Sequence, residues 1–219
     1  MGIMLNSLRG IRFGPRFIVP VLMVCAIIFG ARPAIALDAP LTPEQLVEQF
    51  HVSLLGVMKD AKRLGYRGRL PTLTPEVARA FHLPVMTRIV AGQHWKKLTK
   101  PQKQALVIAF SRMTTATYAH RFNGYGGEKF RMVEALAVRK KSVMIKTELV
   151  KSDGSAVKLD YLVKRYRNGW RVVDIYLDGS FSELATRRSE YSSVLSRKGL
   201  DALITQIDKK VAQYEADAR

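Results

Sequence analysis

The fold class follows from one stretch, AVKLDYLVKRYRNGWRVVDIYL (residues 156–177). In its first half, alternate residues form an apolar face opposite a polar one that carries Lys158, Asp160 and Lys164; the apolar face consists of Val157, Leu159, Tyr161 and Val163. A period of two is typical of a strand with one buried and one wet face. The turn signal Arg167-Asn168-Gly169 separates it from a returning strand. In that second strand apolar residues fall on both faces, which indicates that both sides are covered.

Two further segments upstream have the same period. Together the stretches predict four strands, at residues 131–140, 142–150, 156–166 and 170–177. The connections between them are only a few residues long, and such short connections join antiparallel neighbours. We therefore expect a four-stranded antiparallel meander sheet.

Helical periodicity flanks this sheet on both sides. Thr42-Pro43-Glu44-Gln45 predicts a capped helix that ends near Gly65, and Thr74-Pro75-Glu76 predicts a second, shorter one. Further helical segments are predicted at 85–90, from the cap Thr99 to about 122, at 184–197 after the capping-box-like Ser180-Phe181-Ser182-Glu183, and at 200–214 after Gly199. The pattern predicts an α+β fold of one domain, in which N- and C-terminal helices cover one face of the sheet.

The first 36 residues predict a targeting segment rather than part of the fold. Three arginines precede an apolar run at 17–29, and Ala34-Ile35-Ala36 has the small-x-small pattern of a signal-peptidase site. A membrane anchor is the alternative, but the run has about 13 residues where about 20 are needed to span a bilayer. We expect cleavage after Ala36, a single domain at 37–219 and export to the periplasm.

The composition narrows the partners. The chain has 219 residues, 47% of them apolar, and a net charge of +18. Removing residues 1–36 takes away four Arg and the single Cys, and leaves 183 residues with a net charge of +14. Export makes nucleic acid an unsuitable partner, and the clusters Arg139-Lys140-Lys141, Arg187-Arg188 and Lys209-Lys210 lack the interleaved aromatic residues of a base-stacking surface. The charge then suits lipid head groups or an acidic protein.

Few residues suggest catalysis or a cofactor. His51, His82, His94 and His120 are scattered without metal-ligand spacing, and no P-loop or nucleophile elbow is present, so we expect no metal and no cofactor. Gly124-Tyr125-Gly126-Gly127 lacks a preceding strand and predicts a turn. The enzyme alternative would use Asp174 as a base with Tyr161 as an oxyanion donor; a hydrogen-bonded structural acid near a strand end, paired with an Arg of the following helix, is favoured over it.

Bulky apolar residues gather on the elements that should face the sheet: Phe81, Met86, Phe110, Met113, Tyr118, Phe122, Tyr161 and Tyr176. Composition alone favours an ordinary core over a ligand cavity.

A family resemblance favours a ligand cavity over an ordinary core. It is carried by ordered strings over residues 43–210: FHLP (81–84), AGQHWKKLTKPQ (91–102), AF (109–110), TYA (117–119), VKLDY (157–161), GWRVVD (169–174) and LDGSFS (177–182). These resemble the MlaC family of periplasmic lipid carriers, also called toluene-tolerance proteins. DGSFSELA (178–185) followed by RRSEY (187–191) is most similar to the hopanoid-associated HpnM branch.

The resemblance implies a periplasmic shuttle without enzymatic activity. It implies that the protein holds the tails of a phospholipid or hopanoid in a cavity between sheet and helices, touches membrane surfaces transiently, and exchanges lipid with an inner-membrane transporter and an outer-membrane lipoprotein. The residues expected to line that cavity are Phe81, Met86, Ile89, Phe110, Met113, Tyr118, Val143, Ile145, Tyr161, Val163, Val172 and Leu184. A third interpretation, an adaptor with a solid core, predicts no cavity.

Overall fold

The computed structural model describes residues 40–218, so the predicted targeting segment and the predicted cleavage site lie outside the described residues. The described chain forms five antiparallel strands in the order β1-β2-β3-β4-β5. Their bounds are β1 Lys129–Arg139, β2 Ser142–Val150, β3 Ala156–Tyr166, β4 Gly169–Leu177 and β5 Phe181–Ser182. The α+β class and the four long strands are confirmed. The count of four is wrong, because the two-residue β5 is too short to show any period.

The β5 strand follows a tight turn, and this turn also explains why the prediction that Asp160 lies on a wet face is wrong. Asp178 and Gly179 both have positive φ, which turns the chain back beside β4. The turn brings Gly179 over Asp160, and the Asp160 carboxylate accepts a hydrogen bond from the Thr147 backbone N–H at 3.3 Å. Asp160 is therefore buried and not on a wet face.

The ambiguous pattern of β4 comes from a shift in its register with β3. Tyr161 pairs with Ile175, but Val163 pairs with Val172, so β4 has one extra residue between these pairs. Such a bulge breaks the alternation of faces. Both Val172 and Val173 are buried as a result, in agreement with the prediction of cover on both sides.

The helices are α1 Pro43–Lys59, α2 Ala61–Ala80, α3 Leu83–Ala91, the short 3-10 helix η1 Gly92–Lys97, α4 Lys100–Arg121 and α5 Glu183–Ala216. The capping boxes at Thr42 and Thr99 are both present. Helix α1 ends at Lys59 rather than near Gly65, and Gly65 instead breaks α2 internally with a φ of 58°. Among residues 40–218, the helices lack an apolar stretch long enough to cross a bilayer.

The predicted helix start at Thr74 is wrong. Thr74 lies inside α2, and its hydroxyl donates to the Leu70 carbonyl at 2.9 Å, as that of Thr72 does to Gly68 at 2.8 Å. These bonds to carbonyls four residues back accompany Pro71 and Pro75, which have no backbone N–H to donate. A Thr-Pro pair is thus compatible with a helix interior when the hydroxyl turns back.

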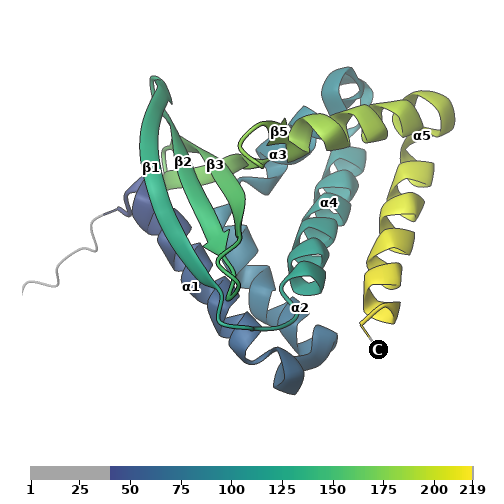
Figure 1. Cartoon of the computed structure of the whole chain (residues 1–219). Coiled ribbons are helices and arrows are strands. Elements are labelled where there is room, and N and C mark those ends of the chain that lie inside the picture. The colour runs from purple at the N-terminus through teal and green to yellow at the C-terminus, as the bar shows by residue number, and fades with distance from the viewer. Residues whose placement is uncertain (1–39, 219) are drawn as a thin grey trace, which may run out of the picture. The chain divides into compact units, whose positions relative to one another are not determined.

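Helix α5 is two limbs separated at Gly199, as the sequence indicated, and the limbs run in clearly different directions in Figure 1. Its cap is Ser182, whose hydroxyl accepts from the Ala185 N–H at 2.9 Å, rather than Ser180.

The helices cover one face of the sheet. Helix α1 contacts all four long strands, α2 and α3 contact β4, and α5 contacts β4 and β5. Helix α4 packs between α2 and α5 (Figure 1). The shared core contains Phe50 and Leu54 of α1, Leu106 of α4, and Ile145 and Val163 of the sheet. Burial of such apolar side chains is the main stabilising contribution to the fold.

Candidate functional site

A pocket of about 560 Å³ lies between the sheet and the helices α4 and α5. Strands β2, β3 and β4, the C-terminal half of α4 and the start of α5 form most of its wall. Its apolar lining residues are Met58, Met86, Phe110, Tyr118, Phe122, Leu149, Val157, Leu159, Tyr161, Ile175, Leu177 and Leu184. A cavity of this size and chemistry is typical of small-molecule binding sites.

Five of the twelve residues expected to line a cavity do so: Met86, Phe110, Tyr118, Tyr161 and Leu184. The structure places the other seven elsewhere. Six of them are in the core or packed against it, and Ile89 is on the surface with 39% of its area exposed; the six are Phe81, Met113, Val143, Ile145, Val163 and Val172.

The reason is the position of the pocket along the strands. It lies at the end of the sheet that contains Leu149, Val157 and Leu177, whereas at the other end Val163 is in the buried core and Val143 packs against it. Alternation identifies the inner face of a strand but not where along it a helix leaves space. Five strand residues that line the pocket were therefore not predicted, although their apolar alternation is visible in the sequence: Leu149, Val157, Leu159, Ile175 and Leu177.

Tyr161, which lines the pocket, is held in place by a histidine. Its hydroxyl is hydrogen-bonded to His51 Nε2 at 3.1 Å, and the His51 ring stacks on Phe130 with 3.8 Å between centroids. Burial lowers the pKa of His51 to about 3 and raises the pKa of Tyr161. Both groups are therefore neutral near pH 7, which suits an apolar wall.

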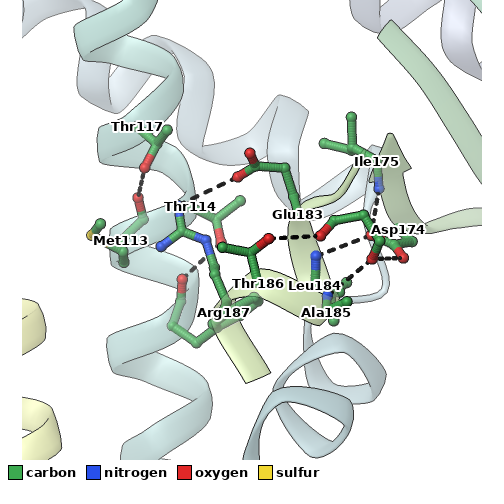
Figure 2. Close-up of polar contacts among 12 residues, drawn as sticks. Met113, Thr114, Thr117, Asp174, Ile175, Glu183, Leu184, Ala185, Thr186 and Arg187 are labelled. Carbon is green, nitrogen blue, oxygen red and sulfur yellow. Dashed lines mark hydrogen bonds and ion pairs between the residues drawn. The ribbon is translucent and has the colours of Figure 1, made fainter. Parts of the chain in front are cut away.

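Asp174 anchors the start of α5 (Figure 2). Its carboxylate accepts hydrogen bonds from the Ser182 hydroxyl at 2.6 Å, the Leu184 N–H at 3.2 Å and its neighbour Ile175 N–H at 2.8 Å. Burial raises the pKa of Asp174, although these three donors act in the opposite direction. Asp174 is thus a hydrogen-bonded acid near a strand end, as expected, but its partner is a helix N-terminus and not an arginine.

Asp174 and Tyr161, the pair of the enzyme alternative, both line the pocket. Each is engaged with a different partner, Asp174 with the start of α5 and Tyr161 with His51. No contact joins the two side chains among the hydrogen bonds of residues 40–218.

The polar part of the lining carries charges of both signs. Glu183 and Arg187 form an ion pair at 3.9 Å beside Thr114 of α4 (Figure 2). Three cationic and four carboxylate side chains contribute to the pocket: Arg121, Lys151 and Arg187, and Glu128, Asp174, Asp178 and Glu183. The charges here nearly balance, in contrast to the net +18 of the whole chain.

The other chemically reactive residues lie apart from one another. His94 is hydrogen-bonded to Ser196 at 3.1 Å, and His120 stacks on Tyr214 with 4.3 Å between centroids. In the part of the chain that the structure describes, no three His, Cys, Asp or Glu side chains gather into a group that could hold a metal ion. The glycine-rich segment 124–127 connects α4 to β1, where the Glu128 carboxylate accepts from the Gly126 N–H at 2.6 Å.

The family model described as MlaC protein matches residues 48–209, well over half of the chain. The chain belongs to the MlaC family. A solved structure from Ralstonia solanacearum, a phospholipid-binding protein in complex with a phospholipid, is similar with a TM-score of 0.70. That similarity covers 80% of this chain and 99% of that chain at 21% sequence identity, so it shows that the two proteins share a fold.

Proposed function

We propose that this MlaC-family protein binds a lipid in the pocket between the sheet and α4, and carries it between membranes. The observation that carries the proposal is the lining, in which twelve apolar side chains surround about 560 Å³ together with charged side chains of both signs. An amphipathic ligand needs both apolar and charged surface. The phospholipid held by the Ralstonia solanacearum protein of the same fold supports this interpretation.

The energetics of such a pocket fit a carrier. Each methylene group moved from water to an apolar site contributes about 0.8 kcal/mol, so ten of them contribute about 8 kcal/mol, equivalent to micromolar affinity. Transfer from a bilayer, where the tail is already in an apolar environment, is close to neutral. The lipid would therefore be held firmly against loss to water yet exchange readily with a membrane.

The charged side chains of the lining suggest which lipid head groups the pocket could bind. Arg187 and Glu183 lie close enough to offer a cation and a carboxylate to one ligand. A guanidinium pairs well with phosphate, and a carboxylate with an ammonium group. We expect the pocket to bind a zwitterionic head group at least as well as an anionic one. We also propose a hopanoid as a ligand, because of the sequence similarity to the HpnM branch.

The cellular role rests on the N-terminal pattern and the family. Residues 1–36 are consistent with export, and the family with exchange between an inner-membrane transporter and an outer-membrane lipoprotein. We propose that the protein works in the periplasm as the soluble component of such a system. An adaptor role with a solid core is disfavoured by the pocket.

The test is lipid occupancy. The full chain is expressed in a bacterial host, and lipids that co-purify with it are identified by mass spectrometry. The protein is then stripped of lipid and incubated with vesicles containing a fluorescent phospholipid. Thr114→Trp places an indole in the pocket and should lower uptake at least tenfold, whereas Ile108→Trp, on the exposed side of the same helix, should not.

Wild-type protein that carries no lipid and takes none from vesicles would refute the proposal. Equal uptake by the two tryptophan variants would place the lipid outside this pocket.

A further inference from the structure

One end of the sheet carries an uncompensated positive charge. Residues 135–147 and 161–173 contain eight Lys and Arg residues and no Asp or Glu. Lys146 forms an ion pair with Glu134 at 3.2 Å. We call the remaining seven the basic sheet end: Arg139, Lys140, Lys141, Lys164, Arg165, Arg167 and Arg171. No ion pair involves any of these seven among the described residues.

The strand register brings these residues together. Arg139 pairs with Ser142, Ser142 with Lys164, and Lys164 with Arg171, across four neighbouring strands. Neighbouring strands are about 4.8 Å apart, so the row is about 14 Å wide. The Lys141 carbonyl accepts from the Arg165 N–H at 2.9 Å, which joins the turn between β1 and β2 to the end of β3. Six of the seven side chains are exposed and Arg171 is half-buried.

Apolar side chains lie next to the charges. Val138 and Leu136 of the edge strand β1 are 50% and 38% exposed. Trp170 is half-buried, and the Arg165 guanidinium lies over its ring at 5.8 Å. Cationic side chains around exposed aliphatic groups and a tryptophan are the combination found where proteins meet the interface of a bilayer.

We infer that the basic sheet end docks the protein on an anionic bilayer surface. Each basic residue near such a surface strengthens binding by about fivefold, and the effect falls off within a Debye length. The surface is separate from the pocket, because Leu149 at the pocket and Ser142 at the basic end are seven residues apart on β2, about 23 Å. Docking is therefore independent of whether the pocket is filled.

The test is vesicle sedimentation of the full chain with phosphatidylcholine vesicles, with and without about one-third phosphatidylglycerol. Wild-type protein should bind the anionic vesicles and release them as salt rises from about 0.1 M to about 0.5 M. A triple variant Arg139→Gln, Lys140→Gln, Lys141→Asn should bind at least tenfold more weakly; Asn is chosen because Lys141 has a φ of 67°.

A matched control removes three exposed cations at another site, Lys96→Gln, Lys97→Gln and Lys100→Gln, with the same change in net charge. Equal weakening by both triple variants, or wild-type binding that is the same on neutral vesicles, would overturn the inference. So would the absence of vesicle binding, which would favour an acidic protein as the partner. If the first variant does not fold, Arg165→Gln with Arg167→Gln tests the same surface. Lipid uptake by the pocket is measured on each variant and should be unchanged.

Discussion

Replacement of His51 by Gln should remove a large part of the acid sensitivity of this protein. His51 of α1 is buried against the sheet, and its pKa is lowered to about 3. In the unfolded chain the same group titrates near 6.5. Below that pH the unfolded state binds a proton that the folded state does not, so stability falls as the pH decreases from 6.5 towards 3.

The magnitude follows from these two pKa values. Between pH 7.5 and pH 5.0 the free energy of unfolding should fall by about 2 kcal/mol through His51 alone, since each pH unit below 6.5 contributes about 1.4 kcal/mol. With a urea m-value of about 2 kcal/mol/M, that is a decrease of about 1 M in the midpoint. Glutamine does not titrate in this range, so the variant lacks this contribution at every pH.

The assay is urea unfolding of lipid-free protein at both pH values, followed by circular dichroism. We expect His51→Gln to be less stable than wild type at pH 7.5, because it loses the stacking of the ring on Phe130, and the difference to narrow by about 2 kcal/mol at pH 5.0. The control His94→Gln leaves His51 in place and should keep its contribution to the pH dependence. A difference between wild type and His51→Gln that is the same at both pH values would refute the reasoning, as would an NMR titration of His51 with a midpoint near 6.5.

Three further predictions concern the groups that fix the elements around the pocket. Arg69 is buried and donates to the carbonyls of Ala119 and Ala61 at 2.9 and 3.1 Å, so Arg69→Met should lower the free energy of unfolding by about 2–4 kcal/mol, measured in urea. Gly199 has a φ of 81° and a ψ of −176°, a region open almost only to glycine, so Gly199→Ala should cost about 1–3 kcal/mol in the same assay although the site has space for a methyl group. Burial raises the pKa of Asp174, so protonation of this group contributes fully to the free energy of unfolding below pH 3.8, and that contribution is lost as the pH rises through the raised pKa. The variant Asp174→Asn should not show this loss of stability in a series of urea titrations at increasing pH. A pH dependence equal to that of wild type would contradict the prediction.

The sequence was most informative where local chemistry determines the structure. The capping boxes at Thr42 and Thr99 fix two helix starts through bonds to residues three positions away, so no distant contact was needed to predict them. The predictions that were wrong depend on other parts of the chain. Asp160 is buried because Gly179 crosses over it, and Thr74 lies inside a helix because the break comes earlier, at Gly65.

The position of the pocket also depends on distant parts of the chain, and so it could not be predicted from local sequence. Leu159 and Val163 are four residues apart on the inner face of β3 and both are aliphatic, yet Leu159 lines the pocket and Val163 is in the core. The pocket that Leu159 lines is bounded on its other sides by residues of α4 and α5, whereas Val163 is fully buried. That space depends on how the helices lie against the sheet, and no pattern within β3 encodes it.

The two proposed sites, the pocket and the basic sheet end, lie apart and depend on different types of force. Apolar transfer at the pocket depends little on salt, whereas attraction between the basic sheet end and an anionic surface is screened within about 10 Å at 0.1 M salt. If one surface performed both tasks, tight lipid binding would also hold the protein on the membrane. With about 23 Å between Ser142 and Leu149, raising the ionic strength should speed release of the protein from vesicles while the affinity of the pocket for its lipid stays the same. Parallel loss of lipid and vesicle binding with salt would show that the two sites are not separate.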